Sequence, residues 1–308
     1  MRRRSKLRGR QLPLTERFNP VSTDLDLRSS YEIAKIINAE DAKVAPVVRR
    51  ALPEIARAID LIAGALQQGG RLIYVGAGTS GRIAALDAAE IPPTFNTHPR
   101  MVQFVMAGGA RALGTAVEAN EDSRELGKRE IAKRRPGKKD VVLGVAASGR
   151  TRFTVAAVQY AKSKGAKTIA ITCNGDSPLE KAADLAIVTE VGPEVISGST
   201  RMKAGTAQKM VLNMLSSGAM AKLGYVYGNL MVSAHRKNRK LAERGIRMLQ
   251  RASAVSRESA ERALKAAGNH VPTALVMLGA QVSRGEAERA LRSEKGNTRR
   301  ALEKLEKT

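Results

Sequence analysis

The stretch from Leu72 to Glu90 places the strongest constraint on what this chain can fold into. It reads as an apolar strand over 72–76, a glycine-rich loop over 76–82 and a helical pattern over 83–90. A continuous apolar run is typical of a strand that is buried on both faces of a parallel sheet. Glycines allow the backbone to turn sharply and to approach a ligand closely. The stretch therefore predicts one strand–loop–helix unit of a parallel α/β fold.

The loop over residues 76–82, called the first loop below, has the composition of an anion-binding site. Thr79 and Ser80 lie between Gly78 and Gly81, so their hydroxyls fall at the start of the predicted helix. Free N–H groups and the helix dipole attract anions at that end of a helix. The loop lacks the Gly-Lys-Ser/Thr of a P-loop, and we find no convincing ribose-binding acid for a dinucleotide site. The pattern favours a phosphate or carboxylate site; the alternative is a turn that binds nothing.

The same arrangement recurs 68 residues further along the chain. An apolar run over 140–147 is followed by Ser148, Gly149, Arg150 and Thr151, called the second loop below, and then by a helical pattern over 153–163. The carboxyl ends of parallel strands meet at one edge of a sheet, where ligands bind. Two hydroxyl-bearing loops at that edge can face one phosphosugar, which weakens the ligand-free alternative.

The remaining pattern predicts a doubly wound parallel sheet. Apolar strands are expected over 102–107, 168–173 and 185–189, and they alternate with helical segments. A long apolar helix is expected over 204–223, at the core or at a subunit interface. The helix that follows the first loop is expected to end just after Glu90, because Pro92 and Pro93 stop it.

The chain divides into three parts by character. Residues 1–20 read as a flexible basic tail, residues 21–250 as a phosphosugar-binding domain with flanking helices, and residues 251–308 as a small helical domain. The helical domain contains an internal repeat, since the pattern over 255–264 returns over 282–291. Serines at the start of both repeats are typical N-cap residues.

Composition narrows the classes of function. The chain has 43% hydrophobic residues and no run near 18 apolar residues, so we expect a substantial core and no membrane partner. A single cysteine, Cys173, excludes an internal disulfide and fits a reducing compartment. The net charge of +24 permits contact with nucleic acid. With 3% aromatic residues and no nucleic-acid motif, specific binding is not expected. One cysteine and three scattered histidines also make no metal-ligand spacing: His98, His235 and His270.

Four segments together resemble the N-acetylmuramic acid 6-phosphate etherase family. They are Gly76–Arg82, Glu90–Phe95, Ala146–Thr151 and Gly192–Lys209. That family has the sugar-isomerase (SIS) fold and is related to the glucokinase regulatory protein. The resemblance extends from about Leu14 to the C-terminus, and Gly192–Lys209 is its most specific part.

The resemblance implies a reaction and a set of site residues. Water and N-acetylmuramic acid 6-phosphate would give N-acetylglucosamine 6-phosphate and D-lactate by elimination and rehydration, without a metal or other cofactor. Glu121 matches the base that removes the sugar C2 proton, and Glu90 matches the acid that protonates the lactyl oxygen. Glu118 is the nearest competitor for the base role. The residues matched to substrate binding are Gly78, Thr79, Ser80, Gly81, Ser148, Gly149, Arg150, Thr151, Glu194, Ser199, Arg201 and Lys203.

The resemblance further implies a cytoplasmic homodimer that recycles cell-wall amino sugars. The chain departs from the family over Val232–Asn238, where an acid is lost and basic residues are gained. Two alternatives on the same fold stay open: a non-catalytic phosphosugar sensor, and an aldose–ketose isomerase that also needs a carboxylate base. Retention of Glu90 and Glu121 disfavours the sensor, and Gly192–Lys209 disfavours the isomerase.

Overall fold

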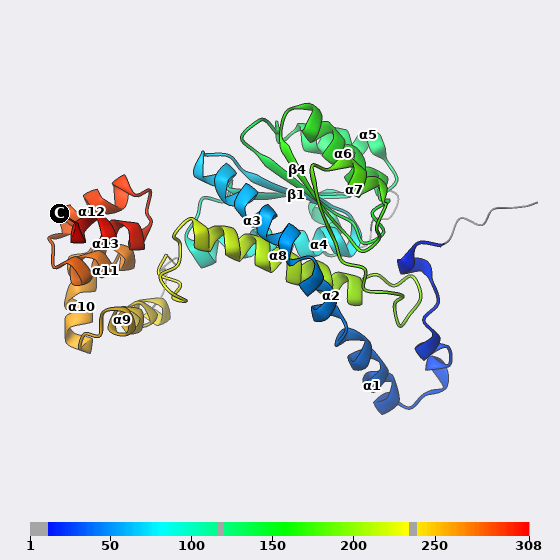
Figure 1. The fold of residues 1–308 in the computed structure, drawn as a ribbon, viewed down its shortest axis with the longest axis horizontal. Coiled ribbons are helices and arrows are strands. Elements are labelled where there is room, and N and C mark those ends of the chain that lie inside the picture. The colour runs from blue at the N-terminus through cyan, green and yellow to red at the C-terminus, as the bar shows by residue number, and fades with distance from the viewer. Residues whose placement is uncertain (1–11, 116, 118–119, 234–238, 308) are drawn as a thin grey trace, which may run out of the picture. The chain divides into compact units, whose positions relative to one another are not determined.

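The protein contains a five-stranded sheet with helices on both faces. The computed structural model in Figure 1 describes residues 12–115, 117, 120–233 and 239–307. The strands lie in the order β2-β1-β3-β4-β5, and the β3–β4 and β4–β5 pairs are parallel. Their bounds are β1 Leu72–Gly76, β2 Val102–Met106, β3 Val141–Val145, β4 Lys167–Thr172 and β5 Leu185–Val188. The predicted doubly wound parallel sheet is confirmed, with each strand within two residues of its expected range.

The residues form two compact units. The first takes its residues from Met1–Ala56, Ile73–Ala85 and Phe104–Leu212, as far as the structure describes them. The second takes them from Arg57–Leu72, Leu86–Gln103 and Asn213–Thr308, with the same restriction. The sheet and both loops belong to the first unit, apart from the first residue of β1 and the first two of β2.

Three helices cover one face of the sheet in the first unit: α5 (Arg124–Ala132), α6 (Arg152–Ser163) and α7 (Pro178–Ala182) (Figure 1). Helices α5 and α6 are in close contact, since a Cβ at Gly127 would lie 2.2 Å from the carbonyl oxygen of Phe153. The buried cluster beneath them is aliphatic except for Phe153, as the aromatic-poor composition predicts: Ile73, Val75, Ala77, Val105, Ala107, Ile131, Val142, Phe153, Ala157, Ala161 and Ala166.

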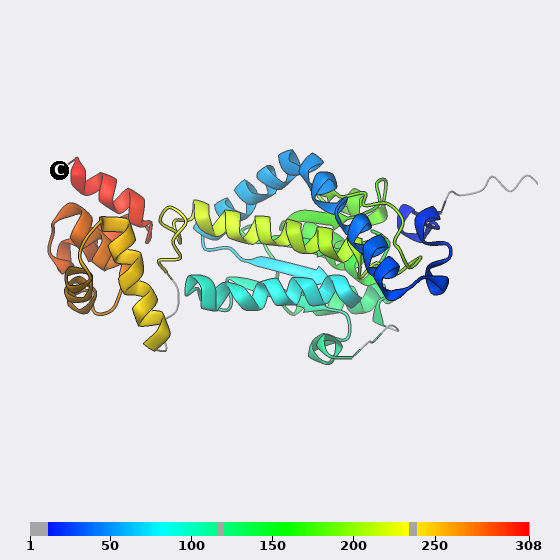
Figure 2. The same ribbon diagram turned by 90° about the horizontal axis from the view of Figure 1, so that it is seen from below.

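Helices α4 (Gly78–Phe95) and α8 (Lys203–Lys222) run side by side (Figure 2). In the first unit, the position of a Cβ at Gly205 lies 3.5 Å from Ile83 and 3.7 Å from Thr79. In the second unit, Ser216 donates a hydrogen bond to Asp87 at 3.0 Å. The start of α8 is therefore held against the start of α4, beside the first loop.

Residues 12–20 differ from the predicted flexible tail. They include the 3₁₀ turn Leu14–Glu16, and Thr15 is buried. The Asn174 side chain donates to the Thr15 hydroxyl at 3.1 Å, and Asn19 donates to the carbonyl of Pro193 at 3.2 Å. These partners lie more than 150 residues away in the sequence, so local composition gave no sign of them. Residues 1–11 lie outside the described part of the chain.

The helices before the sheet are α1 (Ser30–Asp41), α2 (Val44–Arg50) and α3 (Leu52–Gln67). Helix α1 begins at a capping box in which Ser29 accepts from the N–H of Glu32 and the Glu32 carboxylate accepts from the N–H of Ser29. Pro53 falls in the first turn of α3, where a missing N–H costs little.

The helix after the first loop continues past Glu90, contrary to the expectation that paired prolines end it there. Helix α4 includes Pro92 and Pro93 and ends at Phe95. A proline has a φ close to the helical value, so its main cost is a lost hydrogen bond to the carbonyl four residues earlier. That loss is confined here to the last turn. Asn96 follows with a φ of 53°, a left-handed conformation that ends the helix.

The C-terminal helices of the second unit are α9 (Arg239–Ser253), α10 (Arg257–Ala266), α11 (Val271–Ala280), α12 (Arg284–Ser293) and α13 (Thr298–Glu306). Ser256 and Ser283 cap α10 and α12, as the repeat predicts. The helical group begins earlier than the predicted residue 251, because Leu249 of α9 packs in one buried cluster with Leu264 and Val271. No helix in the described ranges is long and apolar enough to cross a membrane.

Candidate functional site

The first loop brings backbone to backbone at the end of β1. A Cβ at Gly76 would lie 2.8 Å from the Cα of Gly81, so Gly76 has no room for a side chain without a shift of the backbone; a Cβ at Gly81 would lie 3.0 Å from the carbonyl carbon of Gly76, which is also tight. Gly78 has a φ of +52°, which glycine adopts without steric cost. The first turn of α4 therefore begins directly at the strand end, with the Thr79 and Ser80 hydroxyls within it.

Glu121 lies directly over this loop. A Cβ at Gly78 would sit 3.0 Å from Oε1 of Glu121. Gly78, Thr79 and Glu121 line a cavity of about 140 Å³, together with Arg82, Met106, Ala107, Ala112 and Val117. The backbone carbonyl of Glu121 accepts from the N–H of Phe153 at 3.0 Å, in the first turn of α6. The structure thus places the predicted base between the first loop and the helix that follows the second loop.

The second loop is also built around a glycine. Gly149 has a φ of +65°, and a Cβ there would lie 2.3 Å from the Ser177 hydroxyl. The Ser148 hydroxyl accepts from the N–H of Arg150 at 3.2 Å. Thr151 is the N-cap of α6, but its side chain makes no capping hydrogen bond. Since β1 and β3 are neighbouring strands of the parallel sheet, the loops that follow them lie at the same edge of the sheet, as predicted.

The segment Gly192–Lys203, called the third loop below, is fixed by contacts of its buried side chains. Glu194 is 0% exposed and accepts from the backbone N–H of Lys203 at 3.0 Å and of Ala204 at 2.9 Å, so it caps α8. Burial raises the pKa of Glu194, although the two N–H donors favour its charged form. Ser199 is half-buried and Arg201 is exposed.

The Lys203 side chain is also buried and paired within the protein. It is 2% exposed, and its ammonium pairs with Glu40, which is 3% exposed. Lys43 also pairs with Glu40, and Asn19 donates to that carboxylate at 3.0 Å. Burial tends to raise the pKa of Glu40, but hydrogen bonds from Lys203, Lys43 and Asn19 outweigh it and lower the pKa to about 2. The Glu194 and Lys203 side chains therefore anchor the third loop.

Glu90 lies on α4 and is exposed. Glu118, the competing base, lies outside the described residues.

Three further residues were absent from the predicted site. Arg82 lines the Glu121 cavity and donates to the carbonyls of Leu113 at 3.3 Å and Thr115 at 3.2 Å. Glu40 pairs with Lys203, and Gln208 accepts a hydrogen bond from Ser80; no local sequence pattern indicates either contact.

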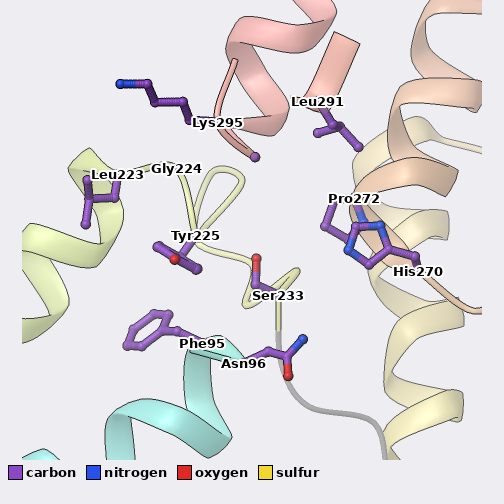
Figure 3. Close-up of a pocket in the computed structure, with 11 residues that line it drawn as sticks. Phe95, Asn96, Leu223, Gly224, Tyr225, Ser233, His270, Pro272, Leu291 and Lys295 are labelled. Carbon is purple, nitrogen blue, oxygen red and sulfur yellow. The ribbon is translucent and has the colours of Figure 1, made fainter. Parts of the chain in front are cut away.

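A second cavity, of about 200 Å³, lies within the second unit (Figure 3). Phe95 and Tyr225 line it and pack edge to face, with ring centroids 6.2 Å apart. His270 and Ser233 also line it. Ser233 is the described end of the segment that departs from the family; residues 234–238 lie outside the described part. This cavity contains no residue predicted to bind substrate.

Comparison with known proteins agrees with the fold. Residues 54–162 match the glucokinase regulatory protein N-terminal SIS domain, and residues 134–217 match the SIS domain. These matches and the sheet define a SIS-domain protein. An N-acetylmuramic acid 6-phosphate etherase from Symbiobacterium thermophilum is 56% identical over 262 residues, which cover 85% of this chain and 87% of that relative. The chain belongs to the N-acetylmuramic acid 6-phosphate etherase family, which confirms the resemblance.

Other similar proteins extend this result. N-acetylmuramic acid 6-phosphate etherase 2 from Vibrio parahaemolyticus is 48% identical and covers 94% of this chain and 96% of its own length. The solved structure of a phosphoheptose isomerase from Neisseria gonorrhoeae superposes with a TM-score of 0.50 at 16% identity, covering 63% of this chain and 100% of its own. At that identity the isomerase shows a shared fold alone.

Proposed function

We propose that the protein is an N-acetylmuramic acid 6-phosphate etherase, which cleaves the D-lactyl ether and releases N-acetylglucosamine 6-phosphate and D-lactate. The observation that supports this most strongly is the Glu121 carboxylate over Gly78, at an edge of the sheet that also holds the second loop. A carboxylate next to an anion-binding loop can act on the sugar whose phosphate that loop holds. Relatives with 46–56% identity over most of the chain have the same named activity.

In the proposed mechanism, Glu121 removes the proton from C2 and Glu90 donates a proton to the lactyl oxygen as its bond to C3 breaks. An ether oxygen is a poor leaving group, so its protonation as the bond breaks lowers the barrier. Lactate leaves, water adds to C3 of the unsaturated sugar, and a proton returns to C2. Atoms and charge balance over the cycle, and the net change is hydrolysis of the ether.

The two loops are proposed to hold the substrate phosphate. Backbone N–H groups at the starts of α4 and α6 and the hydroxyls of Thr79, Ser80, Ser148 and Thr151 provide the donors. Gly78, Gly81 and Gly149 allow close approach of the backbone. Exposed Arg150 and Arg201 and half-buried Ser199 offer polar groups to the rest of the substrate. Binding energy from a phosphate remote from the reacting carbons can be used to position the ether bond.

The direct experiment is incubation of the purified protein with N-acetylmuramic acid 6-phosphate and detection of D-lactate. We expect stoichiometric release of lactate and N-acetylglucosamine 6-phosphate. A phosphosugar sensor would bind the substrate without releasing lactate, and an aldose–ketose isomerase would convert an aldose phosphate to its ketose. Either of those results would replace the proposal.

We also propose that the protein acts in the cytoplasm as a homodimer. The support is the reaction itself, which consumes a sugar phosphate, together with the single buried cysteine and the family resemblance. Light scattering at micromolar concentration tests the dimer. A monomeric mass for the active protein would contradict it.

A further inference from the structure

We propose that Gln208 is a positioning residue that directs the hydroxyl proton of Ser80 toward the bound phosphate. This inference rests on the proposed role of the first loop. Ser80 is 9% exposed and Gln208 is 0% exposed. The Ser80 hydroxyl donates to Oε1 of Gln208 at 2.9 Å, across 128 residues of sequence.

That hydrogen bond has a consequence for anion binding. A serine hydroxyl has one proton, and here the amide oxygen of Gln208 accepts it. Ser80 then offers only lone pairs, which a phosphate oxygen repels. In this arrangement the Ser80 hydroxyl cannot donate a hydrogen bond to a phosphate.

The other end of the same amide has no partner. Nε2 of Gln208 is buried and makes no hydrogen bond with the described residues. Few other side-chain atoms in that part of the chain are buried without a partner. A buried unpaired donor is costly, and the opposite orientation would leave the amide oxygen unpaired in the same place, so the two orientations differ chiefly in whether the Ser80 proton is held or free. A half-turn exchanges its nitrogen and oxygen with almost no change of shape. Nε2 then donates to Ser80, whose proton is released for the phosphate.

The two donors would then act in series, from Gln208 to Ser80 and from Ser80 to the phosphate. Each hydrogen bond in such a chain polarises the next and strengthens it. The position of Gln208 is well fixed, because Glu194 caps α8 and Gly205 packs against Thr79 and Ile83. The structure thus holds an amide behind the first loop that accepts the serine proton or frees it.

The test is a double-mutant cycle on Ser80 and Gln208 in the full chain. Gln208→Met keeps the approximate volume but removes both polar groups. Dissociation constants are measured for N-acetylglucosamine 6-phosphate and for unphosphorylated N-acetylglucosamine. Michaelis constants and turnover numbers are measured on N-acetylmuramic acid 6-phosphate. Thr154→Val is the control: the Thr154 hydroxyl lies on α6 and, like Nε2 of Gln208, is buried with no hydrogen-bond partner among the described residues.

We expect Ser80→Ala to weaken binding of the phosphorylated sugar roughly 10- to 100-fold, as loss of a hydrogen bond to a charged group does. Gln208→Met frees the Ser80 proton but removes the donor behind it, so it should weaken binding less than Ser80→Ala does, roughly three- to tenfold, raising the Michaelis constant with little change in turnover number. In the Ser80→Ala background, Gln208→Met should add less than about twofold, because coupled residues are non-additive. Binding of the unphosphorylated sugar and the Thr154→Val control should change little.

Additive losses, or an unaffected Gln208→Met protein where Ser80→Ala has an effect, would overturn the role of Gln208 and leave the proposed function intact. A non-additive cycle in a protein that never releases lactate would support Gln208 and reject the proposed function. If Gln208→Met fails to fold, Gln208→Asn replaces it, because the shorter amide is withdrawn from Ser80. Wild-type affinity in Gln208→Asn would show that the amide of residue 208 does not need to contact Ser80.

Discussion

Gly78 is constrained twice, by its own backbone and by Glu121. Its φ of +52° is unfavourable for other residues, and the position where its Cβ would stand lies 3.0 Å from the Glu121 carboxylate. Gly149 shows the same pairing of positive φ with a close neighbour, Ser177. At the residue scale, the site depends on the absence of side chains at these positions.

Gly78→Ala should reduce turnover at least tenfold, because the new methyl group displaces the carboxylate of the proposed base; a misplacement of about 1 Å can cost roughly 100-fold. Gly69→Ala is the matched control: its φ is +76°, and no atom of the described residues lies within 4 Å of the new Cβ. Both changes should cost about 1–2 kcal/mol of stability through backbone strain. Equal turnover in the two variants would show that Gly78 does not position Glu121.

Glu121→Gln keeps the shape of the side chain but cannot accept a proton. We expect lactate release to fall by roughly 10²–10⁴-fold, the usual contribution of a general base. Binding of N-acetylglucosamine 6-phosphate should be retained, since the loops supply the phosphate donors. If Glu121→Gln retains most of its turnover, another group is the base, and Glu118→Gln is then the next variant to measure.

At the scale of elements, local sequence patterns were reliable where local physics decides the structure. Continuous apolar runs predicted all five strands, and the glycine and hydroxyl content of the first two loops predicted their turns. One miss is local, since α4 continues through Pro92 and Pro93, but most of the others involve partners far apart in the sequence. Glu194 and Lys203 were predicted to contact substrate, and no local pattern indicated that Glu194 caps α8 or that Lys203 pairs with Glu40. Ser80 was predicted, whereas its partner Gln208 was not.

The buried Glu40–Lys203 pair gives an element-scale prediction. Glu40→Gln leaves the Lys203 ammonium buried without its counter-charge and should cost about 3–5 kcal/mol in the free energy of unfolding. The control is Lys43→Met, which removes the other, 59% exposed ammonium on Glu40 and should cost less than about 1 kcal/mol. Urea denaturation measures both changes. Equal losses would contradict a special role for the buried pair.

The same pair predicts a pH dependence. The Glu40 pKa is lowered from 4.5 to about 2, so the native state favours the charged carboxylate. Its contribution to stability is complete above pH 4.5 and is lost as the pH falls toward 2. Glu40→Gln should therefore reduce the acid sensitivity of unfolding in this range. An unchanged slope of stability against pH would show that other carboxylates dominate.

At the scale of the whole molecule, the net charge of +24 is the least explained property. Six of the 53 basic residues lie in the first ten positions. Deletion of Met1–Arg10 should leave the turnover number nearly unchanged, because charges beyond a Debye length of about 8 Å are screened at physiological salt. Turnover and Michaelis constant are compared at low and physiological ionic strength. A large loss of turnover at physiological salt would make this segment part of the site.

The central claim is that Glu121 abstracts the C2 proton in an elimination, and one measurement tests it most directly. The wild-type protein is allowed to convert N-acetylmuramic acid 6-phosphate in heavy water, and the N-acetylglucosamine 6-phosphate is examined by NMR and mass spectrometry. Elimination followed by rehydration predicts solvent deuterium at C2 of the product. Direct displacement of the ether leaves the C2 hydrogen in place. Product without deuterium at C2, formed by active protein, would contradict both the elimination and the role assigned to Glu121.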